Sequence, residues 1–429
     1  MKYDRINADL FKLNRSLFTA KLKKNSVAIF LSNDEHPWNG DATHNFKQNS
    51  DLFWLSGVDQ EDCILVLSPD CPVIEMREAL FIKRTDDMMV IWNGHKLTQQ
   101  QAKEVSGVQH VYWMEDYEAK IHSVINYAAN IYLNLNENDR ASIKTPYKDL
   151  RFAREMKDKY PLHEFERAAP ILQRLRSIKS PIEVDLMNVS IGISEKMFSR
   201  LLKFVKPGVK EYEVEAEIIH EYLKNRANGH SFHPIVASGK NACILHYVDN
   251  NDTCNDGELL LVDSGVDYAN YASDMTRVIP VNGKFTARQK QVYNAVLSVM
   301  NGAKSLLKPG VLLMEYHKQV GELMEKELVD LGLISLNDIK NQNPAWPAYK
   351  KYFMHGTSHF IGLDVHDVGL FYEPMQIGNA FTVEPGIYIP EEGLGIRLEN
   401  NILITPTGND DLMKNIPLEA DEIESLMNK

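Results

Sequence analysis

The stretch that decides the fold runs from Leu259 to Thr286 and reads LLLVDSGVDYANYASDMTRVIPVNGKFT. Four apolar residues, typical of a buried strand, lead directly into Asp263, and a second strand-like run follows Asp274. Burying an unpaired carboxylate is costly, so Asp263 needs a cation, hydrogen-bond donors or a proton. Each acid alone has an ordinary alternative. Asp263 could be satisfied by the backbone of the next turn, and Asp274 could form a surface ion pair with Arg277.

A second copy of this pattern lies nearer the C-terminus and indicates an internal repeat. Glu384 ends the strand-like run FTVE, and Glu399 lies in the next run, GIRLENNILIT. A histidine precedes the first acid of each copy: His246 lies 17 residues before Asp263, and His366 lies 18 residues before Glu384. Recurring helix, turn and strand are common in α/β proteins, but this joint match is hard to obtain by chance. A duplicated α/β half would place four carboxylates around a pseudo-two-fold axis.

Helix signals recur in the same two places. Ser180 and Glu183 form a capping box around Pro181, which suits the first helical position. Thr286 and Gln289 form a second capping box. Each predicted helix stops at the tetrapeptide KPGV, and an amphipathic helix follows each stop. We therefore predict helices over residues 181–205, 211–226, 287–307 and 313–331.

Histidines complete the candidate metal site. The segment FMHGTSHFIGLDVHD, residues 353–367, holds three histidines, and His359 is the candidate ligand. A single histidine is usually structural, but three in a glycine-containing segment before a buried acid reverse that expectation. Four acids embedded in apolar strands repel one another unless cations lie between them. With one imidazole they form an oxygen-rich set that suits a pair of Mn²⁺, Fe²⁺, Co²⁺ or Zn²⁺ ions.

Such a pair predicts hydrolytic chemistry. Two cations about 3.5–4 Å apart can share a bridging hydroxide and polarise a carbonyl together. The sequence contains no glycine-rich phosphate loop, no GxSxG nucleophile motif and no HExxH motif that would compete with this interpretation.

The region up to about residue 170 has a different character. Short apolar runs at residues 26–32, 63–68 and 130–135 predict strands of a smaller N-terminal α/β domain without a catalytic constellation. A charged stretch from Tyr160 to Lys179 is predicted to be helical and to connect the two regions. The predicted domains are residues 1–172 and 173–429, and the fold class is α/β (α+β).

Composition narrows the possible partners. The 429 residues include 59 acidic and 47 basic ones, for a formal charge of −12, which disfavours binding to nucleic acid or anionic lipid. The four cysteines contain no CxxC pair, as expected of reduced thiols. No run approaches the ~18 apolar residues of a membrane span, and the N-terminus lacks a signal-like apolar core. We expect a cytoplasmic protein with no nucleic-acid and no membrane partner.

Several blocks of the sequence resemble a known family. The Leu259–Thr286 stretch, together with ILHYVDN, HGTSHFIGLDVHD, TVEPGIYI and GIRLENNILIT, is similar to the pita-bread metallopeptidases. NSDLFWLSGVDQEDCILVLSP (residues 49–69) extends the resemblance, over nearly the full chain, to the Xaa-Pro aminopeptidase (aminopeptidase P) family. The resemblance implies a pita-bread catalytic domain and an N-terminal domain that mediates self-association and walls the active site. A homodimer or homotetramer would follow.

The resemblance also implies a role for each candidate residue. The metal ligands would be Asp263, Asp274, His359, Glu384 and Glu399. Glu384 would also pass a proton from the bridging water to the leaving proline nitrogen. His246 and His366 would hold the substrate and stabilise the oxyanion. His355 and Arg397 would orient the ligands and the substrate.

The implied reaction is hydrolysis of the bond between an N-terminal residue and a following proline, most often with Mn²⁺. Phe232 stands where the family usually has a tyrosine, which puts the substrate contacts of that position in question. The nearest alternative is an Xaa-Pro dipeptidase (prolidase), which requires a free carboxylate on the proline. Methionine aminopeptidases generally lack such an N-terminal domain, and a non-catalytic binding protein on the same fold would be expected to have lost ligands. The sequence leaves open the metal, the preferred first residue, the peptide length, and dimer against tetramer.

Overall fold

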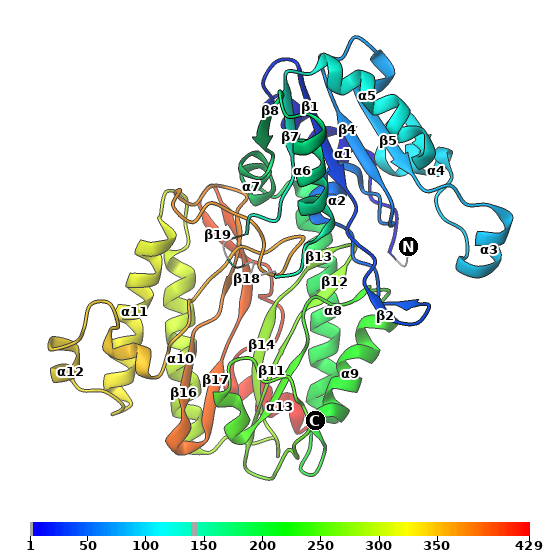
Figure 1. Cartoon of the computed structure of the whole chain (residues 1–429). Helices are drawn as coiled ribbons and strands as arrows, with labels where there is room; N and C mark the ends of the chain where they lie inside the picture. Colours follow the sequence, from blue (N-terminus) through cyan, green and yellow to red (C-terminus); the bar gives the residue numbers. More distant parts are fainter. Residues whose placement is uncertain (1–2, 139, 141–143) are drawn as a thin grey trace. The chain divides into compact units, whose positions relative to one another are not determined.

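The computed structural model describes residues 3–138, 140 and 144–429 (Figure 1). Contacts within the chain divide it after Arg176 into two compact units, an N-terminal unit and a C-terminal unit that begins at Ser177. The boundary expected from the sequence lies four residues earlier. Among the described residues, no helix is long and apolar enough to cross a bilayer.

The N-terminal unit is built on a six-stranded mixed sheet in the order β6-β5-β4-β1-β7-β8. Every residue of the central strand β1 (Ser26–Leu31) is buried, and β1 pairs with one antiparallel and one parallel neighbour, β4 and β7. The three runs predicted as strands therefore form the middle of this sheet. The other strands are β4 (Ile64–Leu67), β5 (Glu78–Ile82), β6 (His110–Trp113), β7 (Asn130–Leu133) and β8 (Glu164–Arg167).

Helices cover this sheet, and a short hairpin extends from it (Figure 1). The hairpin consists of β2 (Pro37–Asn39) and β3 (Ala42–Thr43). Helix α3 (Asp87–Asn93) has no buried residue. The other helices are α1 (Ala8–Thr19), α2 (Ser50–Ser56), α4 (Gln99–Ser106), α5 (Tyr117–Tyr127), α6 (Lys148–Lys159) and α7 (Ala169–Ser177).

One sequence prediction in this unit is wrong in part. The segment from Tyr160 to Lys179, predicted to be helical throughout, contains strand β8 before helix α7. Strand β8 lies at the edge of the sheet and is largely solvent-facing, so charged side chains are tolerated on it. Its sequence EFER therefore lacks the apolar character that identifies a buried strand.

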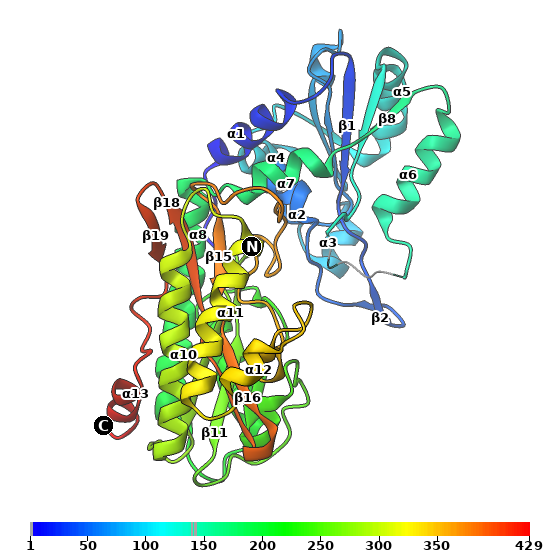
Figure 2. The same cartoon turned by 90° about the vertical axis from the view of Figure 1, so that its left-hand side faces the viewer.

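Four long helices of the C-terminal unit confirm the predicted repeat. Helix α8 (Pro181–Phe204) begins at the Ser180 capping box and α10 (Ala287–Leu306) at the Thr286 capping box. Each is followed by its partner, α9 (Glu211–Lys224) after α8 and α11 (Leu313–Asp330) after α10. The helices of each pair pack against each other, and the strands of the unit lie between the two pairs (Figures 1 and 2).

The strands of the C-terminal unit form small antiparallel sheets in which the pair β11–β14 of the first half corresponds to the pair β15–β18 of the second, while the third strand lies beside β11 in one half and beside β18 in the other. The first half contributes the sheet β10-β11-β14 and the second half the sheet β15-β18-β19. Smaller sheets, β13-β12-β9 and β16-β17, complete the halves. The bounds are β9 (Gly229–His230), β10 (Ile235–Ser238), β11 (Leu259–Ser264), β12 (Val266–Tyr268), β13 (Tyr271–Ala272), β14 (Met275–Pro280), β15 (Ala380–Val383), β16 (Gly386–Ile389), β17 (Leu394–Arg397), β18 (Asn400–Thr405) and β19 (Gly408–Asp411). The remaining helices are α12 (Leu336–Lys340) and α13 (Ala420–Met427).

A glycine sets the bend between β11 and β12. A Cβ atom on Gly265 would lie 1.9 Å from the carbonyl oxygen of Ser273, which no side chain tolerates. This close approach holds the end of β11, which carries Asp263, against the segment that leads into Asp274. The backbone therefore brings the two acids of the first half together.

Candidate active site

The four predicted carboxylates lie at equivalent places in the two halves. Asp263 is near the end of β11 and Glu384 directly follows β15, whereas Asp274 and Glu399 immediately precede the partner strands β14 and β18. Because β11 pairs with β14 and β15 with β18, both antiparallel, the two acids of each half lie at the same end of their sheet. The register places Asp263 opposite Thr276.

Hydrogen bonds join the two halves where the acids meet. The backbone N–H of Glu399 donates to the carbonyl of Thr276 over 3.1 Å. The backbone N–H of Asp274 donates to Asn401 Oδ1 (3.1 Å), and Asn401 Nδ2 donates to the carbonyl of Asp274 (2.7 Å). Acids from both repeats therefore face one buried space.

Three of the predicted ligands already form a compact donor set. Atoms of Asp274, His359 and Glu399 that could bind a metal lie within 4.8 Å of one another, and all three residues are buried. His359 Nε2 lies 3.5 Å from Asp274 Oδ2 and 3.7 Å from Glu384 Oε1. His359 Nδ1 lies 2.9 Å from the carbonyl of Phe360, which can only accept, so the proton belongs on Nδ1. The lone pair of Nε2 is then directed at the carboxylates.

The carboxylate oxygens show whether a metal would fit. One oxygen of each is held by a donor: Asp263 Oδ2 accepts from Arg397 Nη2 (2.6 Å), and Glu399 Oε2 accepts from Thr276 Oγ1 (2.7 Å). Within the described part of the chain, the other oxygen of each, and Asp274 Oδ1, is buried without a hydrogen-bond partner. Buried anionic oxygens without donors are costly unless a cation satisfies them. The residues present therefore fit a divalent metal centre.

Burial raises the pKa of three acids of this cluster. Burial, together with Asp263, raises the pKa of Asp274 well above its ordinary value, and burial with the neighbouring acids does the same for Glu399. Burial raises the pKa of Glu384 to about 7, although His359 opposes the shift. Positive charge inside the cluster is the simplest way to keep all these groups ionised.

A second set of side chains lies beside the cluster. Arg397 bonds to Thr276 Oγ1 and to Tyr388 OH at 3.1 and 2.9 Å, besides its ion pair with Asp263. Tyr388 OH lies 2.8 Å from His355 Nε2, while His355 Nδ1 lies 2.9 Å from the carbonyl of Gly356. Burial, reinforced by the positive charge of Arg397, lowers the pKa of His355 to about 3. His355 is thus a neutral imidazole that accepts from Tyr388.

His246 and His366 lie on the exposed side of the cluster. His246 follows the short helix η3 (Gly239–Cys243) and is exposed. The His366 ring is also exposed and packs edge-on against the His359 ring, with 4.3 Å between the ring centroids. Phe232 reaches the same region, since a Cβ on Gly265 would lie 2.9 Å from its ring. All nine predicted site residues belong to the C-terminal unit.

Sequence reasoning missed two residues of this region. Thr276 and Tyr388 hold Glu399, Arg397 and His355 through their hydroxyl groups. Tyr388 could have been found from its spacing, because residues 384, 386 and 388 alternate along an extended segment and share one face.

The alternative raised for Asp274, a surface ion pair with Arg277, does not form. Arg277 is fully buried and points to the other side of β14, where it donates to neutral acceptors at 2.6–3.0 Å. These acceptors are the carbonyls of Thr276, Glu399 and Pro417 and the side-chain oxygen of Asn400. Alternation along the strand separates Arg277 from Thr276, which faces the acids. Burial lowers the pKa of Arg277 to about 10.

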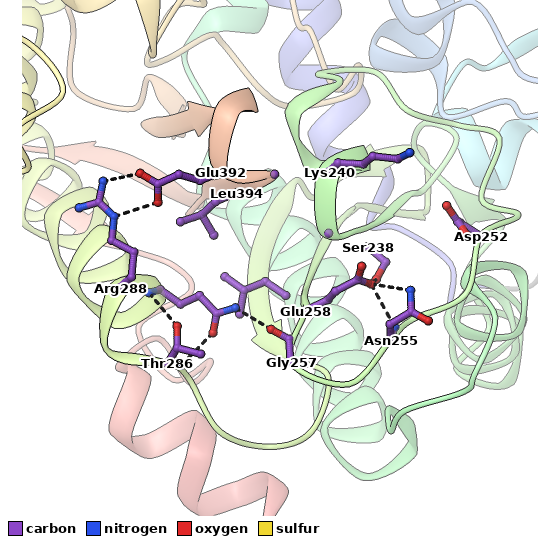
Figure 3. A pocket seen from close by; sticks show the side chains of 14 residues that line it. Ser238, Lys240, Asp252, Asn255, Gly257, Glu258, Thr286, Arg288, Glu392 and Leu394 are labelled. Atoms are coloured by element: carbon purple, nitrogen blue, oxygen red, sulfur yellow. Dashed lines mark hydrogen bonds and ion pairs between the residues drawn. The ribbon is translucent and has the colours of Figure 1, made fainter.

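A separate hollow of about 570 Å³ lies at the opposite end of β11 (Figure 3). Its lining includes Lys240, Glu258 and an ion pair between Arg288 and Glu392. None of the predicted catalytic or metal-binding residues lines it.

Comparisons with known proteins agree with this geometry. The model of the family described as metallopeptidase family M24 matches residues 185–406, and that of the aminopeptidase P N-terminal domain matches residues 11–132. The fold and site thus define a metal-dependent peptidase with two domains. The chain belongs to metallopeptidase family M24.

Full-length relatives narrow the class further. The chain is 33% identical to the Xaa-Pro aminopeptidase of Haemophilus influenzae, over 97% of each chain. It matches the solved aminopeptidase PepP of Pseudomonas aeruginosa with a TM-score of 0.90 at 30% identity, covering 99% of this chain and 98% of the other. It also matches a zinc-substituted Escherichia coli aminopeptidase P in complex with product, with a TM-score of 0.87 at 31% identity over 99% of each chain. The enzyme is a metal-dependent aminopeptidase, and the prolidase alternative is not favoured.

Proposed function

We propose that this enzyme removes the N-terminal residue from peptides whose second residue is proline, using two Mn²⁺ ions held by Asp263, Asp274, His359, Glu384 and Glu399. The observation that carries the proposal is the set of three buried carboxylate oxygens, on Asp263, Asp274 and Glu399, that have no protein donor in the described residues. The full-length relatives named Xaa-Pro aminopeptidase support the substrate class.

The donor set supports manganese as the metal. Four carboxylates and one imidazole make an oxygen-rich site, which suits Mn²⁺ better than a thiolate-preferring ion. When bound, the two ions would activate a water molecule and polarise the scissile carbonyl. The remaining chemistry falls to the side chains around them.

Glu384 would move the proton. Its side chain lies beside the buried acids but is 20% exposed, so its carboxyl group can reach both a water molecule at the metals and a bound peptide, as general acid–base catalysis requires. It would accept a proton from the attacking water at a carboxylate oxygen and deliver it to the proline nitrogen as that bond breaks. A neutral amine leaves far more readily than an amide anion.

His246 and His366 would contact the substrate carbonyl. Both are exposed beside the buried acids, so a bound peptide can reach them. A preorganised donor to a developing oxyanion is worth roughly 3 kcal/mol. His355 and Arg397 would orient the ligands and the substrate. Arg397 donates to Asp263 and to Tyr388 OH, and Tyr388 OH in turn contacts His355, so Arg397 is held in place.

The N-terminal unit would mediate self-association, as a homodimer or homotetramer. Helix α3 supports this, because Met88, Ile91 and Trp92 are 61%, 74% and 78% exposed. An apolar helix surface of this kind is typical of an interface. A cytoplasmic location is also proposed, supported by four cysteines that are all free thiols.

A product assay tests the activity. Metal-depleted enzyme would be given Mn²⁺ and one of three substrates, Ala-Pro-Ala, Ala-Pro or Ala-Ala-Ala. Metal-dependent alanine release from Ala-Pro-Ala, with Ala-Ala-Ala untouched, is expected. Cleavage of Ala-Pro alone would indicate a dipeptidase instead, and equal cleavage of Ala-Ala-Ala would refute the proline requirement.

A further inference from the structure

A buried ion pair lies beside the candidate active site and has no part in the chemistry proposed above. Lys179 Nζ lies 2.7 Å from Asp367 Oδ2, and the two side chains are 2% and 0% exposed. Lys179 immediately precedes the Ser180 cap of α8, whereas Asp367 directly follows His366. Removing one partner of such a pair leaves an uncompensated buried charge.

The ion pair fixes the loop that contains it. A Cβ atom on Gly362 would lie 2.2 Å from Asp367 Oδ2 and 2.5 Å from Lys179 Nζ, so the pair is packed directly on the loop backbone. Asp367 Oδ1 accepts from the backbone N–H of Val368 (2.9 Å). The backbone N–H of Asp367 donates to the carbonyl of Phe360 (2.9 Å). Both carboxylate oxygens and the main chain of Asp367 are therefore held.

The same loop connects two candidate site residues and contacts the segment that leads to a third, Asp274. The loop begins at His359 and ends just after His366. The rings of these two histidines lie 4.3 Å apart at an interplanar angle of 78°. The carbonyl of Gly362 accepts from the backbone N–H of Ala272 (2.7 Å), two residues before Asp274. A change in the ion pair would thus move His366 relative to both metal ligands.

His366 needs such an anchor because its own side chain is exposed. The ring of His359 packs against only part of this imidazole, so the backbone that carries His366 also contributes to its place. Asp367, the next residue in the chain, has a buried carboxylate that can hold this backbone in place.

We infer that Lys179 is a positioning residue: through Asp367 it sets His366 against the substrate carbonyl. The inference rests on the proposed function, in which His366 contacts that carbonyl. Lys179 acts through its ion pair with Asp367.

The test combines kinetics with a second substitution. In Mn²⁺-loaded enzyme acting on Ala-Pro-Ala, Lys179→Met is expected to lower kcat about 100-fold, with metal content unchanged and KM within about threefold. In a His366→Ala background the same change should lower kcat by less than about threefold, because the group it positions is gone. An undiminished loss in that background would overturn the inference, as would wild-type kcat in Lys179→Met.

Stability is controlled separately. The double variant K179M/D367N removes both charges without leaving either buried alone, so its melting temperature should recover towards that of the wild type while kcat stays low. Leu201→Ala, a cavity-forming change in α8, should lower the melting temperature and leave kcat unchanged. Lys179→Arg, which keeps the charge, should retain most of kcat. Recovery of kcat together with melting temperature in the double variant would show a purely structural role.

A second readout is independent of substrate. The imidazole NMR resonances of His366 should shift in Lys179→Met and stay in place in Leu201→Ala. Unchanged His366 resonances would overturn the inference. A wild-type enzyme that leaves Ala-Pro-Ala intact while these shifts occur would instead refute the proposed function.

Discussion

Thr276 and Glu399, 123 residues apart in the sequence, are joined by two hydrogen bonds. The carbonyl of Thr276 accepts from the backbone N–H of Glu399 (3.1 Å), and the Thr276 hydroxyl donates to Glu399 Oε2 (2.7 Å). The first bond ties the two halves of the repeat together. The second fixes one oxygen of the carboxylate and leaves the other, Oε1, directed into the cluster without a protein donor in the described chain.

Replacing Thr276 with valine should therefore weaken metal binding. The change keeps the shape and the main-chain bond but removes the hydroxyl that orients Glu399. Loss of such an orienting group typically costs 10–100-fold in metal affinity, so the Kd for Mn²⁺ should rise by roughly that factor. Calorimetric titration of the metal-free enzyme measures it. Thr405→Val, on strand β18, is the matched control, and equal Kd values for the two variants would contradict this role of Thr276.

Replacing Glu384 with glutamine should abolish turnover without unfolding the protein. The amide cannot accept a proton from water, and general acid–base catalysis contributes typically 10²–10⁴-fold. We expect kcat on Ala-Pro-Ala to fall by at least ~100-fold and the circular dichroism spectrum to stay unchanged. Glu392→Gln, at the distant hollow beside Arg288, should keep wild-type kcat. Turnover near that of the wild type in Glu384→Gln would show that another group moves the proton.

The sequence predicted the helix starts correctly and indicated the candidate site acids where the signal lies in neighbouring residues. Capping boxes at Ser180 and Thr286 predicted where α8 and α10 begin, because side-chain caps act locally. The acids could be chosen because a carboxylate next to an apolar run needs a partner. Both kinds of signal can be read from residues adjacent in the chain.

The sequence was uninformative where partners are distant. The ion pair between Lys179 and Asp367 joins residues 188 apart, and no local pattern marks either as a member of a pair. A surface ion pair of Arg277 with Asp274 could be raised as an alternative because the two residues are close in sequence, but strand alternation places Arg277 on the other side of β14, where it donates to neutral acceptors. A buried arginine that donates to several carbonyls can be recognised only after the sheet is assembled.

A buried carboxyl group in the N-terminal unit predicts a pH dependence of stability. Asp149 is 7% exposed, and burial next to Asp51 raises its pKa to about 8, above the unfolded value of about 3.9. The folded state binds this proton more tightly than the unfolded state does. The free energy of unfolding therefore keeps the full contribution of this group below pH ~4 and loses it as the pH rises towards 8. Asp149→Asn keeps an acceptor for Asn49, which donates to Asp149 Oδ2, and removes the titration.

Asp149→Asn should therefore stabilise the unit more at pH 8 than at pH 5. A gain of about 3 kcal/mol at pH 8 is expected, measured by urea unfolding monitored through the buried Trp54. Asp158→Asn, on the exposed face of the same helix α6, is the control and should show no such trend. A pH-independent difference between Asp149→Asn and the wild type would contradict the burial argument.

The exposed face of α3 should decide self-association. A double change, Ile91→Glu with Trp92→Glu, places charges on the proposed interface and alters no buried residue. Light scattering at micromolar concentration should show a dimer or tetramer for the wild type and a smaller species for the variant. Leu336→Glu, an exposed apolar residue of α12, is the control. A wild-type monomer would refute self-association, and an unchanged oligomer would place the interface elsewhere.

The most direct test of the central claim is a crystal structure of the enzyme soaked in Mn²⁺, with anomalous diffraction to locate the ions. The account predicts two anomalous peaks about 3.5–4 Å apart, enclosed by Asp263, Asp274, His359, Glu384 and Glu399. The three buried oxygens that lack protein donors should lie on these ions. A single peak, or none among these residues, would contradict it.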